Sequence, residues 1–200
     1  MQSVAKNLIK LLNVADKPTL RKQALEQRKA LSEDEFLGQN QLLLAQFKSL
    51  DFSDITSIHV FLPIVKKREP DTYLMIDWLQ ENQPHIHIVV SRANFEDHSM
   101  SHHPFSKEDL LENGYHIPEP QTTAVFEEKI DMVLVPLLAF DNRGYRVGYG
   151  KGFYDRFLSG IETVKVGVSL FEVQDEAISD VNEDDVRLDF CITPKQVYQW

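Results

Sequence analysis

Residues 131–156 read DMVLVPLLAFDNRGYRVGYGKGFYDR, and this stretch decides the fold. Its first part, 131–135, is almost wholly apolar, as in a strand that is buried on both faces of a sheet. Three glycines follow at alternate positions (Gly148, Gly150 and Gly152), and 153–158 is expected to form a helix. Because ligands of parallel α/β sheets bind where strands end, the glycine loop is a candidate binding site.

The same alternation of strands and helices extends to both sides. Further strands are expected at 57–62, 85–90, 164–170 and 190–193, and a further helix at 71–81. The region 100–120 reads as irregular, with a short helix near 107–112. Strands that are apolar on both faces and alternate with helices predict the α/β class. We therefore expect a single domain over residues 1–200: a largely parallel twisted sheet with helices on both faces, in a three-layer, Rossmann-like arrangement.

Two helices are expected before the first of these strands. Asp16 can cap one helix, with Pro18 in its first turn, and Ser32 begins a capping-box pattern for the next. Lys17 and Arg21 are four residues apart, so they share a helical face near the positive end of the first helix. The positions expected to face inward are Leu20, Ala24 and Leu31 in the first helix and Phe36, Leu43, Leu44 and Phe47 in the second.

The composition is that of a folded, soluble protein, with 42% hydrophobic and 26% charged residues. A formal charge of −10 argues against a nucleic-acid partner but leaves room for a small anion in a locally basic pocket. No apolar run approaches the ~20 residues that cross a bilayer, and no secretory signal is evident. Cys191 is the only cysteine, so no intramolecular disulfide is expected, and its apolar neighbours indicate an inert core thiol. These features predict a cytoplasmic monomer with no membrane partner.

Glycines suit a loop that approaches a ligand closely, because they adopt positive φ and carry no Cβ. Successive amides in such a loop can form an anion-binding nest, and the helix that follows adds its positive end. Lys151, within the loop, supplies a full charge, so the pattern favours a polyphosphate ligand. The alternative is a tight strand-to-helix turn with exposed cations.

Two better-known phosphate motifs fit the loop poorly. In a dinucleotide fold Glu172 would be the ribose-binding acid, but the third glycine of that motif would fall at Phe153. A P-loop would need Ser or Thr directly after Lys151, where Gly152 stands.

The loop resembles the hallmark of the 5-formyltetrahydrofolate cyclo-ligase family in two segments, AFD (139–141) and GYRVGYGKGFYDR (144–156). Other segments agree in order: KPTLR (17–21) followed by Arg28 and LSE (31–33), FLP (61–63) followed by EPDT (69–72), IPEP (117–120), VP (135–136), and DVRLD (185–189) followed by TP (193–194). The resemblance runs from about residue 17 to 195. The chain departs from the family at Leu137, where glycine is usual, and at Lys66-Lys67-Arg68, which lengthens the segment before Glu69. Lys151 stands where many members have glycine, although lysine is also a family variant.

The resemblance implies an enzyme that converts 5-formyltetrahydrofolate and ATP into 5,10-methenyltetrahydrofolate, ADP and phosphate, with Mg²⁺. By the same resemblance the catalytic residues are Lys151, Arg21 and Arg146, and the Mg²⁺ ligands are Asp155 and Asp185. The implied ATP-binding residues are Lys17, Pro18, Thr19, Leu20, Arg21, Arg146, Val147, Gly148, Tyr149, Gly150, Lys151, Gly152, Phe153 and Tyr154. The implied folate-binding residues are Arg21, Leu62, Glu69, Tyr149, Gly150, Lys151, Gly152 and Phe153.

Several of these residues have simpler explanations when taken alone. Asp155 can complement the dipole of the helix that it begins, and Glu69 can be a solvated surface charge. Arg92 either meets the glutamate carboxylates of a folate or is exposed without function. The histidines lack recognised zinc spacing, which favours surface or packing roles for His85, His87, His98, His102 and His103.

Two rival functions stay open because one fold hosts many activities. The chain can be a non-folate enzyme, such as a sugar-phosphate isomerase whose loop binds one phosphate, or a catalytically silent nucleotide-binding module. Lys151, Asp155 and Asp185 together favour a magnesium–nucleotide site over a monophosphate site.

Overall fold

The computed structural model describes residues 14–200, and at its centre is a seven-stranded sheet in the order β13-β12-β10-β7-β2-β3-β4. The inner strands all run parallel: β2 (Ser57–His59), β3 (His87–Ala93), β7 (Met132–Pro136), β10 (Val164–Val168) and β12 (Phe190–Ile192). The two edge strands, β4 (Met100–Pro104) and β13 (Val197–Gln199), are antiparallel to their neighbours. The predicted α/β class and largely parallel sheet are therefore confirmed.

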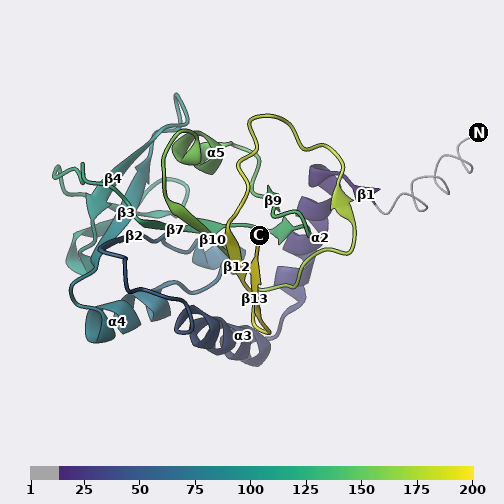
Figure 1. Cartoon of the computed structure of the whole chain (residues 1–200), viewed down its shortest axis with the longest axis horizontal. Helices are drawn as coiled ribbons and strands as arrows, with labels where there is room; N and C mark the ends of the chain where they lie inside the picture. The colour runs from purple at the N-terminus through teal and green to yellow at the C-terminus, as the bar shows by residue number, and fades with distance from the viewer. Residues whose placement is uncertain (1–13) are drawn as a thin grey trace, which may run out of the picture.

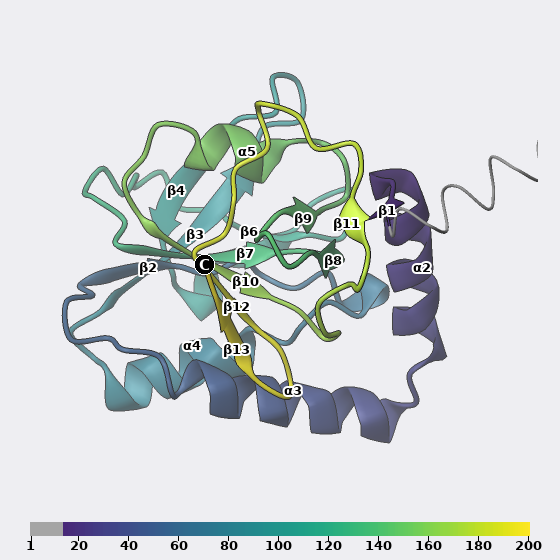
Figure 2. The ribbon, with the colours of Figure 1, turned by 45° about the vertical axis from the view of Figure 1, so that its right-hand side comes forward.

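Helices lie on both sides of this sheet (Figures 1 and 2). The helices α3 (Glu33–Phe47) and α4 (Tyr73–Asn82) lie together on one side, and α5 (Phe153–Leu158) lies on the other. Helix α2 (Lys17–Ala30) stands at the end of the molecule, against the hairpin of β8 (Ala139–Phe140) and β9 (Arg146–Val147). Within residues 14–200, no helix combines the length and the apolar character that crossing a membrane would require.

Strand β7 shows why its sequence is apolar at successive positions. Met132 and Leu134 point into a core that α3 and α4 cover, whereas Val133 and Val135 point into a second core that contains Leu158 of α5. Because successive side chains of a strand alternate between faces, a strand covered on both sides must be apolar throughout.

Both predicted helix starts are confirmed. The Asp16 carboxylate accepts a hydrogen bond from the Thr19 amide at 2.8 Å. Ser32 and Glu35 form the reciprocal capping box, which satisfies two amides that have no partner within the helix. Helix α2 buries one stripe, Leu20, Ala24 and Arg28, so a charged residue lies on its inner face.

The expectation of an irregular region at 100–120 is wrong. This part of the chain contains β4, a 3₁₀ turn at Lys107–Asp109, and a small sheet of β5 (Leu110–Glu112) and β6 (Pro118–Pro120). Strand β4 is polar because it is an edge strand, which needs no continuous apolar run. The terminal strand β13 was likewise not foreseen.

The expected strand at 57–62 is shorter than predicted. Its ladder ends at His59, after which only the Val60 amide bonds across to Val89, at 2.8 Å. The following residues stay extended and buried and lead into a 3₁₀ turn at Val65–Lys67. Two short strands, β1 (Val14–Ala15) and β11 (Ala177–Ile178), pair outside the main sheet.

The close packing at β10 generates a stability prediction. A Cβ added at Gly167 would lie 2.7 Å from methyl carbons of both Leu137 and Leu188 and 3.0 Å from the Cys191 sulfur. Gly167→Ala should therefore lower the free energy of unfolding by about 1–3 kcal/mol, through overpacking. In contrast, Gly38→Ala in α3 meets no atom within 4 Å and should stabilise the protein by about 1 kcal/mol through helix propensity. Urea unfolding of both variants checks this, and equal effects would contradict it.

Candidate functional site

The glycine loop follows β9 of the small β8–β9 hairpin, not a strand of the central sheet as expected. Its three glycines are also not equivalent. Gly150 and Gly152 have φ of +87° and +71°, whereas Gly148 is not among the residues with positive φ. Only the later two therefore have a conformation that requires glycine. The loop ends where α5 begins, as predicted.

Helix α2 contacts the loop through a stripe of cations. Lys17, Arg21 and Arg28 recur at spacings of four and seven, which places them on one side of the helix. The Arg21 Nε donates to the Gly148 carbonyl at 2.9 Å, and the Arg28 Nη1 donates to the Tyr149 hydroxyl at 3.1 Å. Two consecutive loop residues are thus held by two arginines of one helix.

Gly150 is needed because Arg21 lies directly over it. A Cβ at this position would be 3.0 Å from Nη2 of Arg21 and 3.3 Å from its Cζ. The absence of a side chain at Gly150 therefore lets a guanidinium reach the loop backbone.

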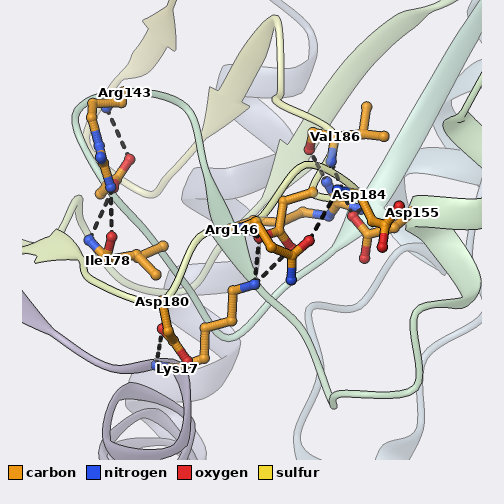
Figure 3. Close-up of polar contacts among 11 residues, drawn as sticks. Lys17, Arg143, Arg146, Asp155, Ile178, Asp180, Asp184 and Val186 are labelled. Atoms are coloured by element: carbon orange, nitrogen blue, oxygen red, sulfur yellow. Dashed lines mark hydrogen bonds and ion pairs between the residues drawn. The ribbon is translucent and has the colours of Figure 1, made fainter.

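The Lys17 ammonium is paired with a carboxylate from the other end of the chain. Its Nζ lies 2.6 and 2.5 Å from the two carboxylate oxygens of Asp185, and its backbone amide donates to Asp180 at 2.8 Å. Asp185 is held in turn by the Asn182 amide, at 2.7 Å. Figure 3 shows Lys17 reaching from α2 toward the segment that carries Asp180 and Asp184.

A second ion pair joins Arg146 of β9 to Asp155 of α5 at 2.7 Å (Figure 3). Arg146 is buried and also donates to the Val186 carbonyl, while the Val186 amide donates to Asp155 at 3.2 Å. Burial lowers the pKa of Arg146, and the charges of Asp155 and Asp185 act in the opposite direction. The carboxylates of Asp155 and Asp185, both expected to bind a metal, therefore act on the Arg146 guanidinium. Each is also paired with a cation expected to bind phosphate, Asp155 with Arg146 and Asp185 with Lys17.

Glu69 is buried, with 4% of its surface exposed, so its interpretation as a solvated surface charge is wrong. Its Oε2 accepts a hydrogen bond from the Ile64 backbone amide at 2.7 Å, across the 3₁₀ turn at Val65–Lys67. Burial and the Glu69 charge raise the pKa of both Tyr149 and Tyr154. The acid therefore lies near Tyr149 of the glycine loop and Tyr154 of α5.

The basic segment before Glu69 turns its cations away from this carboxylate. Arg68 adopts φ of 48°, donates to the Ser32 carbonyl at 3.0 Å, and lies over the Phe36 ring. Lys67 lies over the Tyr149 ring, with its Nζ 4.1 Å from the ring centre. The added length is therefore absorbed by the 3₁₀ turn, and Glu69 stays next to the loop.

The other predicted site residues differ in exposure. Lys151 is exposed, as are Pro18 and Thr19 in the first turn of α2. Leu20 and Val147 are buried in a small core beneath the loop, and Leu62 is buried in the main core. Phe153 is half-buried and packs against the rings of Phe95 and His98.

Arg92 is partly buried and its guanidinium is hydrogen-bonded to the backbone, so the interpretation as an exposed residue without function is wrong, whereas its contact with the glutamate carboxylates of a folate stays a prediction. The guanidinium donates to the Pro120 carbonyl at 3.0 Å and to the Thr122 carbonyl at 2.9 Å. These bonds join β3 to the end of β6 and to the chain that follows it. Arg92 thus holds the fold together at this point.

The histidines divide into surface and packing roles, as favoured. His85 and His87 are exposed, whereas His103 is buried and hydrogen-bonded to Ser101 and to the Ala124 carbonyl. Burial lowers the pKa of His102 to about 4, and of a fully buried neighbour, His59, to about 3. Both are therefore neutral near pH 7. No trio of His, Cys, Asp or Glu within residues 14–200 is arranged to hold a metal ion.

Arg28 belongs to the site, although the sequence pattern that contains it predicted no role for this residue. Its spacing from Lys17 and Arg21 was a usable signal, because all three fall on one side of the helix. Burial of that side was not evident from the sequence.

Fold and site together define an α/β protein with a cation-lined glycine loop beside paired carboxylates and a buried acid. The model of the 5-formyltetrahydrofolate cyclo-ligase family matches residues 13–194, and the chain belongs to this family of enzymes. The chain is 30% identical to a 5-formyltetrahydrofolate cyclo-ligase of Escherichia coli over 165 residues, which cover 72% of this chain and 88% of the relative.

Two solved structures support the same assignment. A 5,10-methenyltetrahydrofolate synthetase of Aquifex aeolicus is 28% identical, with a TM-score of 0.72 and coverage of 92% of both chains. A second, from Mycoplasma pneumoniae, is 27% identical, with a TM-score of 0.65 over 89% of this chain and 98% of its own.

The close approach of Arg21 to the loop generates a prediction that compares two glycines. Gly150→Ala should lower the free energy of unfolding by about 1–2 kcal/mol, since alanine is strained at positive φ and its Cβ meets Arg21. Gly148→Ala meets no atom within 4 Å and should change stability by less than about 0.5 kcal/mol. Chemical denaturation of the two variants measures the difference. A Gly148→Ala variant as unstable as Gly150→Ala would count against this account of the loop.

Proposed function

We propose that this protein catalyses the ATP-dependent cyclisation of 5-formyltetrahydrofolate to 5,10-methenyltetrahydrofolate, with release of ADP and phosphate. The observation that carries the proposal is the meeting of two kinds of site at one loop. Cations and carboxylates suited to a metal–nucleotide lie near it, and so does a buried acid suited to a pterin.

The nucleotide half consists of Lys17 and Arg21 from α2, Arg146 from β9, and Lys151 in the loop. Lys151 is exposed, so its ammonium is free to turn toward a phosphate. Arg146 is buried and donates to the Val186 carbonyl, a contact that does not depend on Asp155, which suits a guanidinium that is held in place to stabilise charge. In our proposal these groups bind the ATP phosphates and stabilise the charge that moves during phosphoryl transfer.

The carboxylates of Asp155 and Asp185 fit a Mg²⁺ ion. Magnesium is usually bound by one or two carboxylates together with substrate phosphates, so a larger cluster of protein ligands is not required. The charges of Asp155 and Asp185 both act on the Arg146 guanidinium, so both carboxylates lie near it. When bound, Mg²⁺ would neutralise phosphate charge, and Asp155 and Asp185 would hold it after exchanging their present partners.

The folate half is proposed to be centred on Glu69. Its Oε2 is already held by the Ile64 amide, and its remaining acceptor capacity can receive the amino and ring N–H groups of a pterin. A buried acceptor that is left unpaired is costly, so such a site disfavours ligands without matching donors.

Activation by phosphate explains why both halves are needed. The formyl oxygen is a poor leaving group, so direct closure of the ring onto N10 would stall. In the proposed reaction the formyl oxygen takes the γ-phosphoryl group of ATP, ADP leaves, and N10 attacks the activated carbon. N10 then loses its proton and phosphate departs. The protein contributes mainly position and charge stabilisation.

The rival functions fit the site less well. A sugar-phosphate isomerase with one bound phosphate needs neither Asp155 nor Asp185 beside its cations. A silent module does not need the buried Glu69 to be held by a backbone amide at 2.7 Å.

The direct experiment mixes the protein with 5-formyltetrahydrofolate, ATP and Mg²⁺ and follows the methenyl chromophore and ADP. Product should form only when nucleotide and metal are both present, with one ADP for each product molecule. Chelation of the metal should stop the reaction. Product formation without nucleotide would contradict the proposal.

Two variants separate the halves of the site, and each is the control for the other. Lys151→Ala should weaken ATP use by roughly ten- to a hundredfold and folate binding much less, because the charge-assisted contact that is lost is made to the phosphates. Glu69→Gln should weaken folate binding and spare ATP, since an amide presents one acceptor oxygen where a carboxylate presents two. Titration calorimetry with each ligand decides the matter. Equal weakening of both ligands by either variant would argue against this division.

A further inference from the structure

We propose that Arg28 is a positioning residue for the folate half of the site, where it sets the hydroxyl of Tyr149 against Glu69. The inference rests on the proposed function and adds a residue to it. Arg28 lies near the end of α2, on the same side as Lys17 and Arg21 but further from the phosphate end of the helix.

The first argument is the unusual burial of this guanidinium. Arg28 is 2% exposed, and within residues 14–200 no carboxylate lies within ion-pair distance of it. Its hydrogen-bond partners are neutral: the Tyr149 hydroxyl at 3.1 Å and the Leu137 carbonyl at 2.6 Å. Its Nε is buried without a partner among the described residues. Burial of a charge whose hydrogen-bond donors are only partly paired lowers the stability of the fold. Such a residue is expected where it contributes to a functional site.

The second argument is the direction of the hydrogen bonds. Arginine can only donate, so the Tyr149 oxygen must accept from Nη1. The hydroxyl proton of Tyr149 is then free to be donated elsewhere, and the charge of the Glu69 carboxylate acts on the same hydroxyl, which makes this carboxylate its acceptor in our proposal. The order Arg28, Tyr149, Glu69 is therefore a chain with one polarity, from a buried cation to a buried anion.

The third argument is that this chain provides Glu69 with a second neighbouring group besides the backbone. The Ile64 amide holds Oε2 at 2.7 Å, and Tyr149 approaches from the glycine loop. Lys67 lies over the Tyr149 ring and restricts its movement further. A carboxylate held by two groups keeps its remaining lone pairs in a fixed direction, as recognition of a planar, donor-rich ring requires.

A purely structural role predicts different behaviour. If Arg28 only ties α2 to the Leu137 carbonyl, its loss should lower stability and affect both ligands alike. If it acts through Tyr149, its loss should raise the KM for folate selectively. Its effect should also disappear once the Tyr149 hydroxyl has been removed.

The test is a double-mutant cycle of Arg28→Met and Tyr149→Phe, measured with 5-formyltetrahydrofolate and MgATP as varied substrates. Each single variant should raise the KM for the folate by roughly tenfold, with the KM for ATP changed less than about threefold. The double variant should be no worse than the poorer single variant. Lys29→Met, at the exposed neighbouring position of α2, is the matched control and should behave as wild type.

Thermal melting and a second variant keep the test decisive if Arg28→Met folds poorly. Arg28→Lys retains the charge but cannot donate to both Tyr149 and Leu137, so it should also raise the folate KM, and again not additively with Tyr149→Phe. Strictly additive effects, or equal changes in both KM values, would overturn the inference while the proposed function stands. A wild-type protein that forms no methenyl product would remove the proposed function, and the inference with it.

Discussion

The site depends on the approach of two arginines of α2 to the backbone of the glycine loop. Arg21 reaches the Gly148 carbonyl across Gly150, where a Cβ would stand 3.0 Å from its guanidinium. This contact spans more than a hundred residues of sequence and joins the first helix to the hairpin of β8 and β9. It is made possible by a missing side chain, so its main requirement is steric.

The charges around the loop are arranged in pairs before any ligand is considered. Lys17 is held by Asp185 and Arg146 by Asp155, which prevents a group of like charges from repelling each other in one small region. Both pairs are partly shielded from solvent, with Arg146 the more deeply buried. Each pair joins a group suited to phosphate with one suited to a divalent metal. Binding of a metal–nucleotide would therefore exchange partners, and would not need to bring new charges together.

The proposed folate half is built on the opposite principle, since its charges are buried and separated. Glu69 and Arg28 are both almost inaccessible to solvent, and Tyr149 lies between them. Charges in such surroundings are costly unless hydrogen bonds hold them, and this cost makes the arrangement selective for one geometry. The two proposed halves meet in consecutive loop residues, Gly148 and Tyr149, an arrangement that would let one short loop serve both ligands.

Much of this protein was determined by local sequence. The α/β class followed from apolar strands such as 131–135, and the helix starts at Asp16 and Ser32 followed from side chains that cap nearby amides. These features depend on a few neighbouring residues, so they can be read without the fold. Edge strand β4 and the hairpin of β8 and β9 could not, because strand pairing at an edge depends on what lies beside it. The burial of Glu69 and Arg28, and the pairing of Lys17 with Asp185, were decided only by the tertiary structure. They join segments far apart in sequence, and solvent exposure depends on the whole packed chain.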